Sequence, residues 1–167
     1  LRFIMFIMIR STFLMILSSS RSVLIMNDYI EINKIWMDPF CFELEIICAS
    51  NCICARTKTY TSEDRVNDLY GKLKKFINGK SKECLWKNGE KGSSSAPYIS
   101  FRFIRKDKLG HILIEIYLEI DDGGTLEDHH CCFYVNTELG LLSNFCKNLP
   151  RLNKPIIGTT VILNDVD

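Results

Sequence analysis

Apolar and polar residues alternate along several short segments of the chain, and this period of two is typical of half-buried β-strands. In residues 42–48 the apolar side chains occupy every second position, and Glu43 and Glu45 lie between them. Residues 111–121 repeat the pattern with five aliphatic residues on the expected core side. The other side of that strand is expected to face away from the core and carries Leu113, Glu115, Tyr117, Glu119 and Asp121.

Further strands are expected where similar segments lie between turn residues such as Asp38-Pro39 and Gly123-Gly124. In residues 29–36 the apolar positions are Ile30, Ile32 and Ile35. Because short turns join most of these strands, neighbours should pair antiparallel. The remaining expected strands are residues 52–60, 83–86, 98–106, 129–136 and 158–164.

Two other segments have apolar residues at helical spacing. Thr61 or Ser62 is expected to cap the first helix, and Asn78-Gly79 to end it. Thr137 is expected to cap the second helix, which Pro150 closes. The order is therefore βββ-α-ββββ-α-β. It predicts an α+β fold with a mainly antiparallel sheet of about seven to eight strands, covered on one face by two helices.

The first 25 residues differ from the rest because they contain three arginines, no acid and many Ile, Met, Phe and Ser residues. They imitate a secretion signal, but Arg10 interrupts the apolar run, at a cost of roughly 2.5–3.5 kcal/mol on insertion scales. The run is also shorter than the ~20 residues that span a bilayer. We therefore expect residues 1–25 to be an extension outside the fold, and residues 26–167 to form a single α+β domain.

The charge of the chain is nearly balanced, with 21 basic and 20 acidic residues. Without residues 1–25, 18 basic and 20 acidic residues remain. Because binding to a phosphate backbone needs clustered Lys and Arg, this balance argues against a nucleic-acid partner. The one basic run, residues 72–75, lies on the first expected helix and is interpreted as a solvated helix face. We expect no membrane partner.

Most of the eight cysteines lie in or beside strand-like or helix-like apolar segments, as free buried thiols do. We therefore expect a reduced, cytoplasmic protein. Residues 129–132, His-His-Cys-Cys, attract attention as a metal or catalytic cluster. Because neighbours on a strand point to opposite faces, neither face offers four ligands, and we expect no metal and no cofactor. A small enzyme that uses His129 or His130 with a nearby Cys or Glu stays as an alternative, although no catalytic residue is assigned.

The outward side of the central hairpin is the favoured functional surface. Arg102 on the first arm should face outward with the polar set of residues 111–121. If Glu43 and Glu45 face the same way, the sheet presents an acidic surface that suits a basic protein partner. An ordinary solvated sheet face with cross-strand Arg–Glu pairs is the competing interpretation. The expected partner-binding residues are Arg102, Glu115, Tyr117, Glu119 and Asp121.

Several segments together resemble small bacterial immunity proteins, and specifically the wall-associated-protein immunity family of contact-dependent toxin systems. They are Ile30-Glu31-Ile32 with Trp36, residues 42–46, the helical residues 69–76, and residues 113–116 followed by Asp121-Asp122. The resemblance covers most of residues 26–164. It implies a cytosolic protein that binds one cognate toxin domain and has no catalytic residues. A ligand-binding or scaffold domain is the third possibility.

Overall fold

The computed structural model describes residues 26–51, 53–93, 96–120 and 129–164. Within them the chain forms eight strands, two α-helices and one short 3-10 helix. In chain order they are β1 (Met26–Met37), β2 (Phe42–Asn51), β3 (Ile53–Thr61), α1 (Glu63–Ile77), β4 (Glu83–Asn88), β5 (Ile99–Arg105), β6 (His111–Glu119), β7 (His130–Glu138), α2 (Leu139–Asn148), η1 (Leu149–Asn153) and β8 (Thr160–Leu163).

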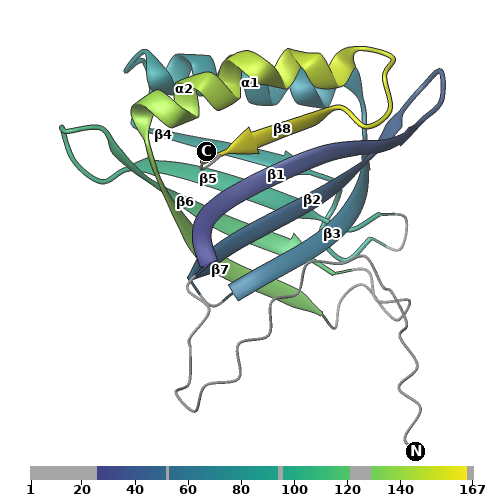
Figure 1. The fold of residues 1–167 in the computed structure, drawn as a ribbon, viewed down its shortest axis with the longest axis horizontal. Coiled ribbons are helices and arrows are strands. Elements are labelled where there is room, and N and C mark those ends of the chain that lie inside the picture. Colours follow the sequence, from purple (N-terminus) through teal and green to yellow (C-terminus); the bar gives the residue numbers. More distant parts are fainter. Residues whose placement is uncertain (1–25, 52, 94–95, 121–128, 165–167) are drawn as a thin grey trace, which may run out of the picture.

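The α+β class, the two helices and the order βββ-α-ββββ-α-β are confirmed. The strands are divided between two four-stranded antiparallel sheets, with orders β3-β2-β1-β8 and β4-β5-β6-β7. The first three strands of one sheet and all four strands of the other pair antiparallel in chain order, as in a meander. The final strand then returns to the first sheet, where β8 pairs with residues 30–33 of β1. Figure 1 shows the first sheet in front of the second.

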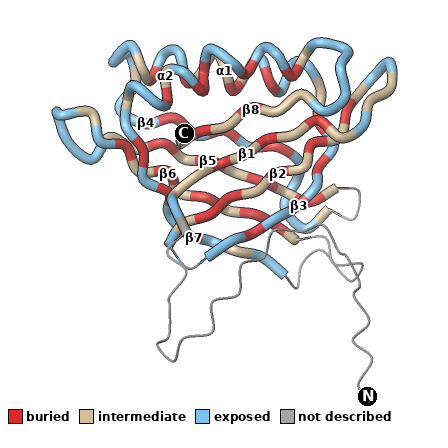
Figure 2. The backbone as a smooth tube through the Cα atoms, in the orientation of Figure 1, coloured by how far each residue is buried: buried red, intermediate tan, exposed pale blue. Residues whose placement is uncertain are grey.

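The core lies between the two sheets and under the helices. Side chains from the inner faces of both sheets and from α1 and α2 form one cluster of buried apolar residues. The two helices lie side by side along one side of the sheets, where α1 contacts β4 and α2 contacts β8 (Figure 1). Buried and more exposed positions alternate along the strands, as the period of two predicts (Figure 2).

Hydrogen bonds between side chains and backbone join the two sheets at two places. The carboxylate of Asp28 on β1 accepts bonds from the Ser50 hydroxyl, at 2.7 Å, and from the Asn136 backbone amide on β7, at 2.6 Å. On the other side, Thr57 on β3 donates to the carbonyl of Glu119 at the end of β6, at 2.7 Å. These contacts fix how the outer face of one sheet is placed relative to the other.

Both helices form. Ser62, one of the two expected caps, is the N-cap residue of α1, whereas the expected cap of α2, Thr137, is wrong. Ser62 occupies the position before α1 but makes no side-chain capping bond, and Thr61 donates its hydroxyl to Asn88 Oδ1 at 2.8 Å. Thr137 belongs to β7 and bonds to Asn164, so that Glu138 precedes α2. In both cases a tertiary partner takes the hydroxyl that would otherwise cap a helix.

Lys34 is buried on the same side of β1 as Ile30 and Ile32, because the alternation continues through it. Ile35, the third apolar position in the sequence, is only partly buried, and the register of β1 against β2 shifts between Lys34 and Trp36. The Lys34 side chain is only 1 % exposed. Its ammonium donates to the Lys154 carbonyl at 2.6 Å and lies 4.4 Å from the centre of the Phe42 ring. Desolvation lowers the pKa of this amine, and the charge of Glu63 opposes that shift.

Residues 1–25 lie outside the described part of the chain, and their expected independence from the domain stays a prediction. The core among the described residues draws on residues 30–163. A variant that begins at Met26 should therefore keep its free energy of unfolding within about 0.5 kcal/mol. Chemical denaturation of the two proteins would check this. A melting temperature several degrees lower in the shorter protein would show that the segment packs on the core.

Candidate functional site

The outer face of the second sheet carries the expected partner-binding residues that the structure describes. Its central row crosses all four strands, because Leu85 pairs with Arg102, Arg102 with Glu115, and Glu115 with Tyr134. We call the surface around this row the β4–β7 face. Leu85 and Tyr134 at its two ends are 41 % and 48 % exposed. The row is therefore open to a partner at both ends.

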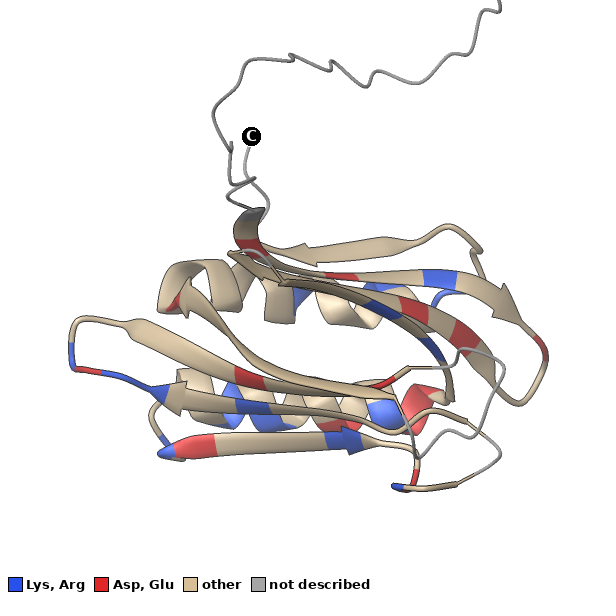
Figure 3. Ribbon diagram, turned by 90° about the horizontal axis from the view of Figure 1, so that it is seen from below, with Lys and Arg blue, Asp and Glu red and all other residues tan. Residues whose placement is uncertain are grey.

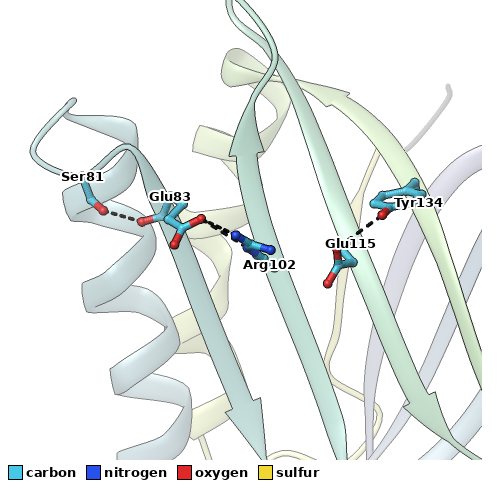
Figure 4. Close-up of polar contacts among 5 residues, drawn as sticks. All are labelled: Ser81, Glu83, Arg102, Glu115 and Tyr134. Carbon is cyan, nitrogen blue, oxygen red and sulfur yellow. Dashed lines mark hydrogen bonds and ion pairs between the residues drawn. The ribbon is translucent and has the colours of Figure 1, made fainter.

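Cross-strand contacts hold the polar groups in the middle of this row. Arg102 donates through Nη2 to Glu83 Oε2 at 2.8 Å and through Nε at 3.2 Å. Hydrogen bonding to Glu83 raises the pKa of the Arg102 guanidinium. Across β6 and β7, the Tyr134 hydroxyl donates to Glu115 Oε2 at 3.4 Å. Figure 4 shows the four side chains in line across the sheet, so that their orientations are fixed before any partner arrives.

The expectation of one large acidic surface does not hold. Glu43 and Glu45 lie on the first sheet, where Arg56 approaches Glu45 to 3.6 Å. The two sheets lie on opposite sides of the molecule, and the strands of both contain basic as well as acidic residues (Figure 3). On the β4–β7 face, Arg102 neutralises Glu83. A partner would therefore meet a surface of mixed charge.

Glu119 lies on the same side of β6 as Tyr117, as the alternation predicts. The expectation that its side chain is exposed is wrong. The residue is only 2 % exposed, because the segment between β4 and β5 covers it. Its two carboxylate oxygens accept backbone N–H bonds from Gly92, at 3.1 Å, and from Tyr98, at 2.8 Å. Glu119 thus ties this segment to the sheet. Asp121, the fifth expected residue, lies outside the described residues.

A cavity of about 400 Å³ lies at the Glu119 end of the β4–β7 face. We call it the Tyr117 cavity. The Tyr117 ring stacks on the imidazole of His130 with 5.3 Å between ring centres, and the Tyr98 ring lies 5.7 Å away. The Lys91 ammonium is 4.7 Å from the centre of the Tyr117 ring. The cavity is lined by Lys91, Gly92, Tyr117, Glu119 and His130.

The residues of the His-His-Cys-Cys segment are distributed as strand alternation predicts. Cys132 pairs with Tyr117 and is exposed, whereas Cys131 pairs with Leu118 and is partly buried. The expectation of buried thiols is therefore wrong for Cys132, and also for Cys54, which is exposed. The described residues contain no group of three or more His, Cys, Asp or Glu side chains placed to hold a metal ion.

Two residues that complete this site were not among the residues expected from the sequence. Tyr134 could have been found from the alternation in residues 129–136, because it shares the parity of His130 and Cys132. Nothing in the sequence placed Lys91 beside Tyr117, since that contact depends on how the segment after β4 folds back over the sheet.

Three further observations bear on identity. Comparisons with protein-family models, with curated proteins and with solved structures found no match. No helix in the described ranges is long and apolar enough to cross a membrane. Among the cysteines that the structure describes, all seven are free thiols. The geometry of the β4–β7 face and of its cavity is therefore the basis for the function proposed below.

Proposed function

We propose that this chain is a protein-binding module, and that it acts as an immunity protein whose β4–β7 face binds and blocks a cognate toxin domain. The observation that carries the proposal is the central row of that face. It combines a half-exposed tyrosine and a half-exposed leucine with an arginine and a glutamate that are already oriented by cross-strand contacts.

Two residues of the row, Tyr134 and Arg102, are of types enriched among energetically dominant interface positions. A tyrosine contributes a large contact area with little loss of conformational freedom, and an arginine contributes directed hydrogen bonds. Tyr134 and Arg102 are additionally held by Glu115 and Glu83. Rigid side chains lose less entropy when a partner binds, so a preformed row supports tighter binding.

The size of the face indicates how far a partner must reach. Four strands that lie about 4.8 Å apart and are about seven residues long give a face of roughly 15 by 24 Å. A stable interface buries about 800 Å² on each partner, which is roughly twice that area. The partner should therefore extend beyond the central row, and the Tyr117 cavity lies at one end of it.

A second candidate function is supported by one observation, which is the position of the cavity beside His130. Glu119 pairs with His130 across β6 and β7, so a carboxylate and an imidazole line one cavity of ligand size. This arrangement suits a small-ligand site or a simple acid–base enzyme. Turnover of a small substrate that is lost in His130→Gln would favour this function over the first.

The binding proposal can be tested with a matched pair of tyrosines. Tyr134 on the β4–β7 face and Tyr60 on the first sheet are both 48 % exposed. Tyr134→Ala should weaken binding to the cognate toxin domain by about 30-fold, a loss of about 2 kcal/mol, whereas Tyr60→Ala should leave it unchanged. Isothermal titration calorimetry would measure both affinities, and survival of toxin-expressing cells would report protection.

Glu115→Lys supplies a second variant, because reversing a charge at an interface changes binding much more than folding. Thermal melts of all three variants should stay close to that of the unmodified protein. If Tyr60→Ala weakens binding and Tyr134→Ala does not, the partner docks on the first sheet, and the assignment of the β4–β7 face is wrong.

A further inference from the structure

The ammonium group of Lys91 lies against the aromatic wall of the Tyr117 cavity. This contact suggests what the cavity binds. We propose that the cavity receives a lysine or arginine side chain of the partner, and that Lys91 occupies this cation position in the free protein. The inference rests on the proposed function, because it names the chemistry of the partner at one end of the β4–β7 face.

The aromatic walls of the cavity are suited to a cation. Tyr117 lies between His130 and Tyr98, whose ring centres are 5.3 Å and 5.7 Å away. The face of an aromatic ring carries partial negative charge and attracts a cation within about 6 Å of its centre. The Lys91 ammonium already lies within that range, at 4.7 Å. The structure thus shows an ammonium group seated against the ring.

A buried carboxylate supplies the charge that selects a cation over an anion. Glu119 lines the cavity and is 2 % exposed, and the backbone amides of Gly92 and Tyr98 hold both of its oxygens in place. A carboxylate in a poorly hydrated site attracts positive charge more strongly than one in open water. If Lys91 moved into solvent, the cavity would present an aromatic wall and this carboxylate together.

The position of Lys91 allows such an exchange. Lys91 is exposed and lies between β4 and β5, next to Gly92, whose amide is bonded to Glu119. Its side chain can therefore leave the ring while the backbone stays attached to the sheet. Two ammonium groups over one ring repel each other, so an incoming cation must compete with Lys91. Removing the Lys91 ammonium should consequently tighten binding of a foreign cation.

The competition can be measured without the partner. Nα-acetyl-lysine N-methylamide would be titrated into the full-length protein, with its Nε-acetylated form as the neutral control, while NMR follows the ring protons of Tyr117 and His130. The cationic probe should shift these signals, and the neutral one should not. Lys91→Ala should bind the cationic probe about fivefold more tightly than the unmodified protein, and Tyr117→Leu should lose about the same factor.

Three results would overturn the inference. Equal binding of the neutral probe would show an apolar cavity. Weaker binding of the cationic probe in Lys91→Ala would show that Lys91 does not compete with it, and no binding in Lys91→Ala would show that the cavity takes no cation. Tyr134→Ala in the toxin-binding assay reports on the proposed function separately. The cavity inference can therefore fail while the β4–β7 face still binds toxin, and the reverse outcome is equally distinguishable.

Discussion

Replacing Glu119 with lysine should destabilise the domain by about 3–5 kcal/mol, because the change leaves a buried charge without its partners. Two backbone amides, those of Gly92 and Tyr98, would lose their acceptor, and the new ammonium would lie in a site that is 2 % exposed in the native protein. Each buried donor that loses its acceptor costs about 1–3 kcal/mol by itself. Urea unfolding, followed by circular dichroism, would measure the change.

Glu115→Lys is the matched control, because Glu115 lies four residues earlier on the same side of β6 and is only half-buried. Its effect on stability should stay within about 1 kcal/mol. The sequence pattern places both glutamates on the side that faces away from the core, where each should tolerate a charge reversal, and the burial of Glu119 corrects this for that residue. If Glu119→Lys melts like Glu115→Lys, the segment between β4 and β5 does not cover Glu119 in solution.

The second large effect is a loss of stability at alkaline pH. Burial raises the pKa of the Cys84 thiol from 9.0 to about 11, and it raises the pKa of the Cys48 thiol by more than that. Above pH 9 the unfolded chain releases these protons while the folded chain keeps them, so the free energy of unfolding falls as the pH rises. Each thiol contributes a slope of about 1.4 kcal/mol per pH unit, and for Cys84 the slope should end near pH 11.

Two cysteine variants would separate this effect from general alkaline unfolding. Cys84→Ala should remove about 1.4 kcal/mol per pH unit from the slope between pH 9.5 and 11, whereas Cys132→Ala, which changes an exposed thiol, should not alter it. The lowered pKa of Lys34 makes the free energy of unfolding rise with pH just below pH 10.5, because there the unfolded chain holds more protons on that amine. Denaturation curves at several pH values would measure the slope for the unmodified protein and for each of the two cysteine variants. An unchanged slope in Cys84→Ala would contradict the burial of this thiol.

The sequence by itself determined the class of fold and most of its elements. Strands β2 and β6 follow directly from alternating residues, because a half-buried strand needs one apolar face. The span of α1 follows from apolar residues at helical spacing and from Gly79, which ends the helix with a φ of 73°. Parity along β6 also placed Glu115 and Tyr117 on one side. These features depend on local periodicity and turn chemistry, which a single segment contains.

Only the tertiary structure decided how the strands divide and which polar residues are buried. The return of β8 to β1 and the split into two sheets depend on contacts between residues far apart in the chain, as do the hydroxyl bonds of Thr61 and Thr137. Lys34 and Glu119 lie at polar positions that become buried because distant backbone groups complete their hydrogen bonds. A periodic pattern specifies which way a side chain points. Whether that direction leads to solvent depends on which segment packs over it.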